Sequence, residues 1–368
     1  MTTERISAPS AYAHKAVVYI GRFQPFHNGH LALLLRALEL GEKVVVVLGS
    51  SFRSRNTKNP LTWQERAAMI RLAVPEQHRD RVHFAPVRDY YGTGTEGDER
   101  WVNAVRAGVA RAIGDADRNI ALIGHFKDAS SYYLNHFPGW KLESVDREGD
   151  IDATHLRNVL YTTAQMDREA ALAVLSAHMP NGCIAYLNAW LALPYFAQLA
   201  KEWTNIQKEK AAWSTAPYPP LFITLDSLVT CADHVLLIER RNEIGIGNGL
   251  LALPGGYLEQ YETLYQGAIR ELREETKLGI ASEYLASYFR GTDVYDHPNR
   301  DERGRLVTHL HRFELRGDHV PEVEGRSDAR VAIWVHKDKL REMEDRFFAD
   351  HGHILAKELK FEFPDYAI

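Results

Sequence analysis

Short apolar runs alternate with amphipathic stretches over the first third of the chain. The apolar runs, rich in β-branched residues, read as buried strands, and the stretches between them repeat apolar residues at the three- and four-residue spacing of helices. The expected strands are 16–20, 43–49, 81–87 and 119–125, and the expected helices are 30–40, 66–74 and 99–113. This alternation predicts an α/β domain with a Rossmann-like parallel sheet and helices on both faces.

The pattern changes after Asp150, where helical periodicity continues through 164–178 and 184–201. A charged, proline-containing stretch follows, and then apolar and polar residues alternate as in half-buried strands. The later strands are expected at 221–230, 234–240, 284–289, 306–315 and 331–335, with a long helix at 261–277 and a helical tail. We therefore expect a domain at 15–207, a linker at 208–220, and a second domain at 221–368 with a mixed sheet between helices.

Composition limits the classes of function. A chain of 368 residues and 41.9 kDa exceeds one usual hydrophobic core, so two or three domains are expected. The 44 Lys and Arg residues against 49 Asp and Glu give a formal net charge of −5, whereas a general nucleic-acid binder would carry a basic excess. Phosphorylated small molecules stay open as ligands, because a few local cations suffice to bind them.

The cysteines and the apolar runs indicate the subcellular location of the protein. Cys183 and Cys231 are too isolated for a disulfide framework or a zinc cluster, so we expect both to be reduced. The N-terminal residues lack the apolar stretch of a signal peptide, and the longest aliphatic run, 44–48, is too short to span a bilayer. We expect a cytoplasmic protein without a membrane or nucleic-acid partner; a homo-oligomer is left open.

The segment 21–30, GRFQPFHNGH, joins the first strand to the first helix. His27 and His30 lie three residues apart at the helix start, where unpaired N–H groups and the helix dipole favour an anion. Arg22 adds a permanent cation with a planar fork suited to phosphate. In a parallel sheet this loop lies at the carboxyl end of a strand, where ligands bind. The pattern predicts a phosphate site; the alternative is a helix cap and a core histidine.

This segment resembles the GxFxPxHxGH signature of the nucleotidyltransferase superfamily. The superfamily's second signature, close to I-S-x-T-x-x-R, is similar to residues 151–157, with Asp152 where serine is usual. The resemblance implies that His27, His30 and Arg157 are catalytic and that Thr154 lies in the site, capping its helix. A carboxylate at Asp152 would repel phosphate, so no phosphate contact is expected there.

Further segments narrow the resemblance to archaeal-type nicotinamide mononucleotide (NMN) adenylyltransferases. They are NPLTW at 59–63, RWV at 100–102 and GHFKD at 124–128. Stacking a pyridinium ring on an indole is physically sensible, although a tryptophan on such a helix is equally expected in the core. The resemblance implies an ATP and NMN site formed by Gly21, Arg22, Phe23, Gly29, Trp101, Gly124, Lys127 and Thr154.

A second site is indicated by acidic residues on the helix expected at 261–277. Glu271, Glu274 and Glu275 share one helical face, where like charges destabilise an isolated helix. Hard oxygen ligands gathered in this way suit a divalent cation such as Mg²⁺ or Mn²⁺. A solvated charged face is the alternative for these residues taken alone.

The whole run from Gly256 resembles the Nudix box, in which a late glycine is replaced here by Lys277. We expect this replacement to alter the helix exit more than the metal site. The resemblance implies metal ligands at Glu271, Glu274 and Glu275, catalysis by the last two, and support from Glu262 and Arg270. Residues resembling Nudix enzymes of ADP-ribose imply a substrate site at Gly255, Gly256, Arg300, Arg303 and Arg305.

The order of the two modules resembles the bifunctional NMN adenylyltransferase/Nudix hydrolases of bacteria. The resemblance implies synthesis of NAD and pyrophosphate from ATP and NMN, and Mg²⁺-dependent hydrolysis of ADP-ribose to AMP and ribose 5-phosphate. The expected partners are ATP, NMN, NAD and ADP-ribose. Alternatives are a transferase for another acceptor, such as pantetheine phosphate, and a Nudix domain that cleaves other nucleoside diphosphate derivatives or serves as a ligand sensor.

Overall fold

The structure is a computed structural model that describes residues 12–90, 96–114, 119–125, 134–145, 152–241 and 245–364. The chain forms two compact units. The first unit comprises residues 1–52 and 58–197, and the second comprises 53–57 and 198–367. These limits differ from the linker expected at 208–220, so the domain boundaries inferred from the sequence stay a prediction. Each unit is described by itself below.

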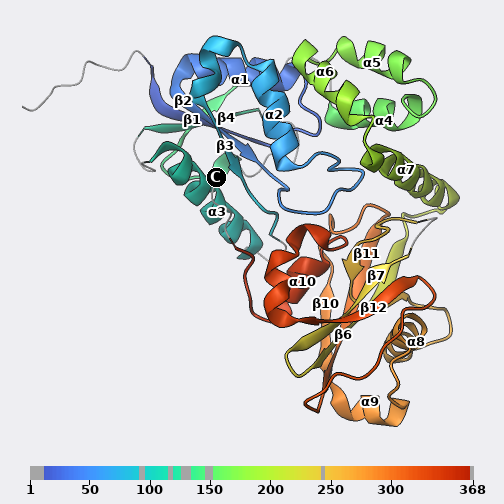
Figure 1. The fold of residues 1–368 in the computed structure, drawn as a ribbon. Helices are drawn as coiled ribbons and strands as arrows, with labels where there is room; N and C mark the ends of the chain where they lie inside the picture. Colours follow the sequence, from blue (N-terminus) through green and yellow to red (C-terminus); the bar gives the residue numbers. More distant parts are fainter. Residues whose placement is uncertain are drawn as a thin grey trace, which may run out of the picture. The chain divides into compact units, whose positions relative to one another are not determined.

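A parallel sheet with strand order β3-β2-β1-β4-β5 organises the first unit (Figure 1). Its strands are β1 (His14–Gly21), β2 (Gly41–Leu48), β3 (Val82–Pro86), β4 (Ile120–Gly124) and β5 (Lys141–Ser144). The connecting elements are α1 (Asn28–Leu40), α2 (Trp63–Ala73), the short η1 (Glu76–Arg81) and α3 (Glu96–Ile113). The expected parallel α/β domain is confirmed. The edge strand β5 was not expected, because three of its four residues are polar and its two end residues are exposed.

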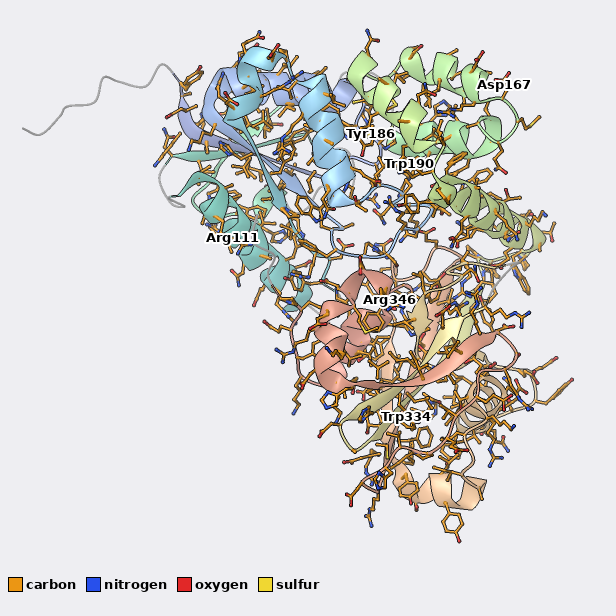
Figure 2. The ribbon with its side chains drawn as sticks, in the orientation of Figure 1. Arg111, Asp167, Tyr186, Trp190, Trp334 and Arg346 are labelled. Carbon is orange, nitrogen blue, oxygen red and sulfur yellow. The ribbon has the colours of Figure 1, made fainter. Side chains whose placement is uncertain are left out.

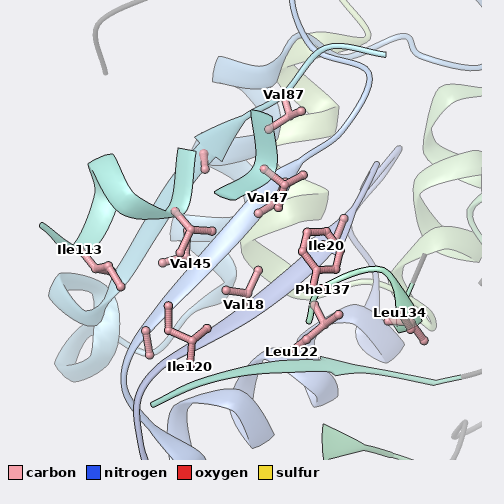
Figure 3. Packing of buried hydrophobic residues seen from close by; sticks show 14 residues of the cluster. Val18, Ile20, Val45, Val47, Val87, Ile113, Ile120, Leu122, Leu134 and Phe137 are labelled. Carbon is pink, nitrogen blue, oxygen red and sulfur yellow. The ribbon is translucent and has the colours of Figure 1, made fainter. Parts of the chain in front are cut away.

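Valines from the central strands form the core of this unit (Figure 3). Val18 and Ile20 of β1 lie on one face with Val45 and Val47 of β2, because side chains two apart in a strand share a face. Val105, on α3, covers this face. Each fully buried valine stabilises the fold by about 1.5–3 kcal/mol, so the central strands form a stable base for the loops at their carboxyl ends.

The order of the strands reverses at β1, which pairs with β2 on one side and β4 on the other. Open parallel sheets bind ligands outside the carboxyl ends of the strands at such a switch point. Gly21 ends β1 and Gly124 ends β4, so two residues of the expected nucleotide site terminate neighbouring strands.

Helices follow the sheet: α4 (Ala153–Thr163), α5 (Arg168–Ser176), α6 (Asn181–Trp190) and α7 (Pro194–Ala212). The single helix expected over 184–201 is wrong, because Pro194 cannot continue a helix and starts a new one. Trp190, labelled in Figure 2, is buried near this break and contacts Phe196 edge-on. Within the described residues no single helix is long and apolar enough to span a membrane; α6 and α7, which are bent by 89° relative to each other, have the necessary length and apolar character only when taken together.

A mixed sheet with the path β10-β11-β6-β7-β12 organises the second unit. Its strands are β6 (Leu221–Cys231), β7 (His234–Arg240), β8 (Leu251–Ala252), β9 (Gly255–Tyr257), β10 (Phe289–Tyr295), β11 (Arg305–Leu315) and β12 (Ala329–His336). Its helices are α8 (Leu264–Thr276), α9 (Ser282–Tyr288) and α10 (His351–Glu358), with short turns η3 (Lys337–Glu342) and η4 (Glu344–Arg346). Strands β6 and β11 run parallel, and the other pairs are antiparallel.

Both faces of this sheet are covered, as expected for a Nudix-like α/β/α sandwich. Val229 and Ile238 pack with Leu272 of α8 in one core cluster, whereas Val235 and Ile354 of α10 belong to another. Trp334 on β12 (Figure 2) donates its indole N–H to the Pro321 carbonyl.

The strand expected at 284–289 is wrong, since most of this segment is helix α9. Leu285 is buried whereas Tyr284 and Ser287 are exposed, which is one inward side chain per turn. A strand would instead have buried alternate residues.

Candidate functional sites

The loop between β1 and α1 forms the first site. Gly21 lies beside the ring of Phe23, and a Cβ on Gly21 would approach the Phe23 Cζ atom to 2.8 Å. Phe23 has a left-handed φ of 52°, and its buried ring contacts Tyr19 and His30 edge-on. Gly21 therefore allows the aromatic ring to fold back beneath the loop and support the histidines.

His27 and His30 stack at the N-terminus of α1. Their ring centroids are 3.6 Å apart, and a Cβ on Gly29 would lie 3.3 Å from the His27 ring. The backbone N–H of His27 donates to His30 Nδ1 at 3.4 Å. Because Nδ1 accepts this bond, the proton of a neutral His30 resides on Nε2. His30 can therefore donate from Nε2 to an anion at the helix end.

Burial lowers the pKa of His30 well below its ordinary value, and the neighbouring His27 and His125 lower it further. The imidazole is consequently neutral near pH 7, so it is available as a hydrogen-bond donor and carries no positive charge. Arg22 in the same loop is exposed and supplies the positive charge. This division of roles suits a phosphate that gains charge as a bond breaks.

The second motif reaches the same loop from α4. Arg157 is buried; its Nη1 donates to the Gln24 carbonyl at 2.6 Å, and its Nη2 donates to Thr154 Oγ1 at 3.1 Å. The helix cap is Asp152, whose carboxylate accepts from the His155 N–H at 2.8 Å, so the expectation that Thr154 caps the helix is wrong. The unusual aspartate thus serves as the helix cap.

Outside the two signature motifs, the residues expected to bind the nucleotides are Trp101, Gly124 and Lys127. Trp101 on α3 is partly buried and contacts the Phe137 ring edge-on, so its indole packs against the core cluster of the first unit. Gly124 ends β4, and a Cβ there would meet Leu134 at 2.8 Å. Lys127 lies outside the described residues. The structure thus brings the two signature motifs together and leaves the nicotinamide contacts as predictions.

The second site is built on α8. Thr263 caps this helix by accepting from Gln266 N–H. Just before it, Glu262 accepts from Arg270 Nη2 at 2.7 Å and from Nε at 3.0 Å. Arg270 Nη1 also donates to Glu271 at 2.8 Å and to Glu274 at 3.3 Å. The supporting roles expected for Glu262 and Arg270 therefore have a geometric basis: Glu262 orients Arg270 against two of the carboxylates.

Glu275 is the most buried of the three carboxylates. Its Oε2 accepts from the Gly255 N–H at 2.8 Å, while burial, helped by Glu271 and Asp328, raises its pKa to about 8. Burial also raises the pKa of Glu271. A Cβ on Gly256 would lie 2.3 Å from Glu271 Oε1, so the two glycines allow β9 to approach the acidic face of α8 closely.

A divalent cation fits the chemistry of these residues. Three carboxylates on one helical face supply hard oxygen ligands, and two of them have raised pKa values that a cation would lower. In this conformation, however, no group of three acidic, histidine or cysteine side chains among the described residues closes around one point. Arg270 occupies Glu271 and Glu274, so binding a metal there requires Arg270 to withdraw from them.

Lys277 occupies the exit of α8 where the Nudix pattern has glycine. Its φ of 47° and ψ of 32° are left-handed, and its N–H still donates to the Arg273 carbonyl. The backbone therefore keeps the conformation that glycine favours, at a steric cost of about 1–2 kcal/mol. Lys277 Nζ pairs with Glu324 at 2.7 Å on the surface, which offsets little of that cost.

We expect Lys277→Gly to raise the free energy of unfolding by about 0.5–1 kcal/mol, because relief of the left-handed strain exceeds the lost surface pair. Calorimetric unfolding of the full chain measures this change. Lys277→Ala is the matched control, since it removes the ion pair and keeps the strain. A glycine variant less stable than the alanine variant would contradict the assignment of strain.

A polar cavity lies in the second unit beside β9. Four of the five residues expected to bind ADP-ribose line it, namely Gly255, Gly256, Arg300 and Arg303. Arg300 donates to Asp350 through Nε at 3.0 Å and Nη2 at 2.9 Å, and Arg303 is held in the same manner by Asp301. Arg305 is not among the lining residues, and its guanidinium contacts the Asp296 carbonyl. The cavity therefore presents arginines that are rigid and already charge-paired.

Sequence reasoning missed the carboxylates and the histidine of this cavity. Asp226 of β6 is buried, and burial raises its pKa. His351 Nδ1 accepts from the Leu253 N–H at 3.0 Å, and its Nε2 lies 4.0 Å from Asp226. The only acidic side chain in a largely apolar strand was the available signal for Asp226, whereas nothing local marks Asp350 or His351.

Comparisons with known proteins identify the domain that carries each candidate site. The family model described as Cytidylyltransferase-like matches residues 18–102, and the NUDIX domain model matches residues 225–357. A nicotinamide/nicotinic acid mononucleotide adenylyltransferase of Acinetobacter baylyi is 33% identical over 193 residues, which cover 52% of this chain and 95% of that protein.

Solved structures extend the similarity to both units. The crystal structure of a bifunctional NMN adenylyltransferase/ADP ribose pyrophosphatase from Francisella tularensis has 32% identity and a TM-score of 0.84, covering 94% of this chain and 99% of that one. A second structure of the Francisella protein, complexed with AMP and a manganese ion, gives a TM-score of 0.83 at the same identity.

Proposed function

Because the chain belongs to the family of bifunctional NMN adenylyltransferase/ADP-ribose pyrophosphatases, we propose that it carries both activities. One unit transfers the adenylyl group of ATP to NMN, giving NAD and pyrophosphate. The other hydrolyses ADP-ribose to AMP and ribose 5-phosphate. The observation that carries this conclusion is the presence of two constellations, the histidine loop with Arg157 and the carboxylate helix beside a polar cavity, in a chain matched over 94% of its length.

In adenylyl transfer, a phosphate oxygen of NMN attacks the α-phosphorus of ATP, and the bond to the β-phosphate oxygen breaks. No covalent enzyme intermediate is required, so positioning and charge stabilisation supply the catalysis. His30 donates from Nε2 to the phosphate oxygens, and the N-terminus of α1 adds backbone N–H groups. Arg22 provides the exposed cation, while Arg157 fixes the backbone of the loop.

In ADP-ribose hydrolysis, water adds to one phosphorus of the diphosphate and the bridging P–O bond breaks. A divalent cation held by Glu271, Glu274 and Glu275 would polarise the diphosphate and lower the pKa of water. Gly255 N–H holds the Glu275 carboxylate in place. Arg300 and Arg303 are neutralised by Asp350 and Asp301, so they orient the substrate by directed hydrogen bonds more than by net charge.

Mg²⁺ or Mn²⁺ is proposed as the cofactor of both units, with ATP as a substrate. The Francisella protein was crystallised with AMP and manganese, and the hard-oxygen donor set on α8 supports the same class of ion here. We propose small nucleotides as the partners and the cytoplasm as the location. An acceptor such as pantetheine phosphate is not favoured, because the similar adenylyltransferases are named for nicotinamide nucleotides and, in the Acinetobacter protein, also for nicotinic acid mononucleotide.

Two incubations test the proposal directly. The full chain is supplied with Mg²⁺, ATP and NMN, and separately with Mg²⁺ and ADP-ribose, and the products are identified by chromatography and mass. We expect NAD and pyrophosphate from the first and AMP and ribose 5-phosphate from the second. Nicotinic acid mononucleotide and pantetheine phosphate serve as competing acceptors. A faster reaction with pantetheine phosphate than with NMN would refute the assignment of NMN as the acceptor. Failure to release AMP from ADP-ribose would refute the proposed hydrolase activity.

A further inference from the structure

Arg66 is a fully buried arginine on α2, in the first unit, with 0% exposure. Its guanidinium donates through Nη1 to the Arg22 carbonyl at 2.6 Å and to the Gly49 carbonyl at 2.7 Å. Its Nη2 donates to Ser51 Oγ at 3.1 Å, and its Nε donates to the Thr62 carbonyl at 3.3 Å. One side chain therefore joins three separate segments of backbone.

Two of those segments are the loops at the carboxyl ends of neighbouring strands. Arg22 follows β1 within the histidine loop, and Gly49 follows β2. A backbone hydrogen bond from the Gly49 N–H to the Gly21 carbonyl at 3.0 Å joins the two strand ends. Beyond it, each loop leaves the extended conformation at a residue with left-handed φ, Phe23 at 52° and Ser50 at 50°. The Arg66 guanidinium adds a second connection between the two loops, one residue further along the histidine loop.

Burying a guanidinium is costly unless its donors are satisfied. Burial lowers the pKa of Arg66 to about 9, while Asp89 and Glu65 raise it and Arg22 lowers it, so the side chain stays protonated near pH 7. The hydrogen bonds described above run to carbonyls and a hydroxyl, and Asp89 acts on the charge through space. A neutral side chain could pack in this core without the cost of burying a charge. We therefore relate the presence of the Arg66 guanidinium to the hydrogen bonds by which it holds the two loops.

The histidine loop is also held from its other side. Arg157 donates to the Gln24 carbonyl at 2.6 Å, and the Gln24 side chain exchanges two hydrogen bonds with Leu61, through Nε2 at 2.8 Å and Oε1 at 3.0 Å. The carbonyls of Arg22 and Gln24 are thereby fixed by arginines from two different helices. Fixing both carbonyls sets the direction of the backbone that leads into His27 and His30.

We propose that Arg66 is a positioning residue for adenylyl transfer, which clamps the loops after β1 and β2 so that the histidine pair meets the triphosphate in its reactive geometry. Arg66 has no exposed surface, so it acts through the loop and touches no substrate. The inference rests on the proposed function of this unit. Wild-type NAD synthesis tests that function, and the variants below test the clamp.

The experiment compares Arg66→Gln and Arg66→Lys with wild type in the full chain. We measure kcat and KM for ATP and NMN, together with thermal unfolding. A misplaced loop should lower kcat about 10²-fold in Arg66→Gln and change KM much less, because a shift of about 1 Å costs that much in a positioned reaction. Arg66→Lys should retain more of the activity, and added guanidinium ion should restore part of kcat in Arg66→Gln.

Arg81 provides a matched control in the same unit. It donates to the Glu42 carbonyl at 2.9 Å and to the Gly41 carbonyl at 2.6 Å, at the opposite ends of the strands. Arg81→Lys and Arg81→Gln should lower the unfolding temperature and leave kcat unchanged. A kcat for Arg66→Gln equal to that of Arg81→Gln would overturn the proposal. If Arg66→Gln does not fold, the kcat of Arg66→Lys tests the proposal instead. A kcat equal to that of wild type would contradict the positioning role, and a loss of about tenfold would support it.

Discussion

We expect His30→Ala to lower the rate of NAD synthesis about 10²–10³-fold, the loss typical of removing one donor that stabilises developing charge. The His30 Nε2–H is directed by the bond that Nδ1 accepts from His27, and burial keeps the ring neutral. Alanine removes this donor and also the ring that stacks on His27 at 3.6 Å. The effect should appear mainly in kcat, measured as NAD formed per enzyme.

The hydrolase of the same chain is an internal reference for this variant. Release of AMP from ADP-ribose should be unchanged in His30→Ala, because the rings that pack against His30, those of Phe23, Phe26 and His27, all belong to the first unit. His14→Ala is the matched control: His14 lies at the amino end of β1 and bonds Asn119 and Glu143. That variant should lose stability and keep kcat. Equal loss of both activities in His30→Ala would contradict the separation into two modules.

The sequence predicted the histidine loop and the acidic helix because each is a contiguous motif whose spacing places the side chains on one surface. The motif from Gly21 to His30 and the motif from Glu271 to Glu275 can each be recognised from consecutive residues, without information on contacts to distant segments. The parallel sheet of the first unit was predictable for the same reason, since its valine runs are local. Asp152 was identified as a departure, but its role as the cap of α4 required the backbone geometry.

Contacts between distant segments could not be predicted. Arg66 has the local pattern of an ordinary helix residue, and its function as a clamp depends on carbonyls 44 and 17 positions earlier. Asp350 pairs with Arg300 across 50 positions. The segment 284–289 reads as a strand in the sequence, whereas tertiary packing selects a helix that buries Leu285.

The second large effect is expected from Glu274→Gln combined with Glu275→Gln. Removing two anionic oxygen ligands should lower the rate of ADP-ribose hydrolysis about 10³-fold or more, because a bound cation supplies several kcal/mol of charge stabilisation. Glutamine keeps the size of glutamate, and its amide oxygen can still accept from the Gly255 N–H that Glu275 binds at 2.8 Å. The fold of α8 should therefore persist. The measurements are AMP release across a Mg²⁺ titration and Mn²⁺ binding by paramagnetic resonance.

NAD synthesis by the same double variant should remain at the wild-type rate, which separates loss of a metal ligand from loss of the protein. Glu314→Gln is the matched control, since its exposed carboxylate pairs with Arg290 on β10 and lies outside α8. It should leave hydrolysis and Mn²⁺ binding unchanged. The two readouts distinguish the possible errors: unchanged hydrolysis would refute the assignment of these carboxylates, whereas lost hydrolysis with unchanged Mn²⁺ affinity would give them a catalytic role other than metal binding.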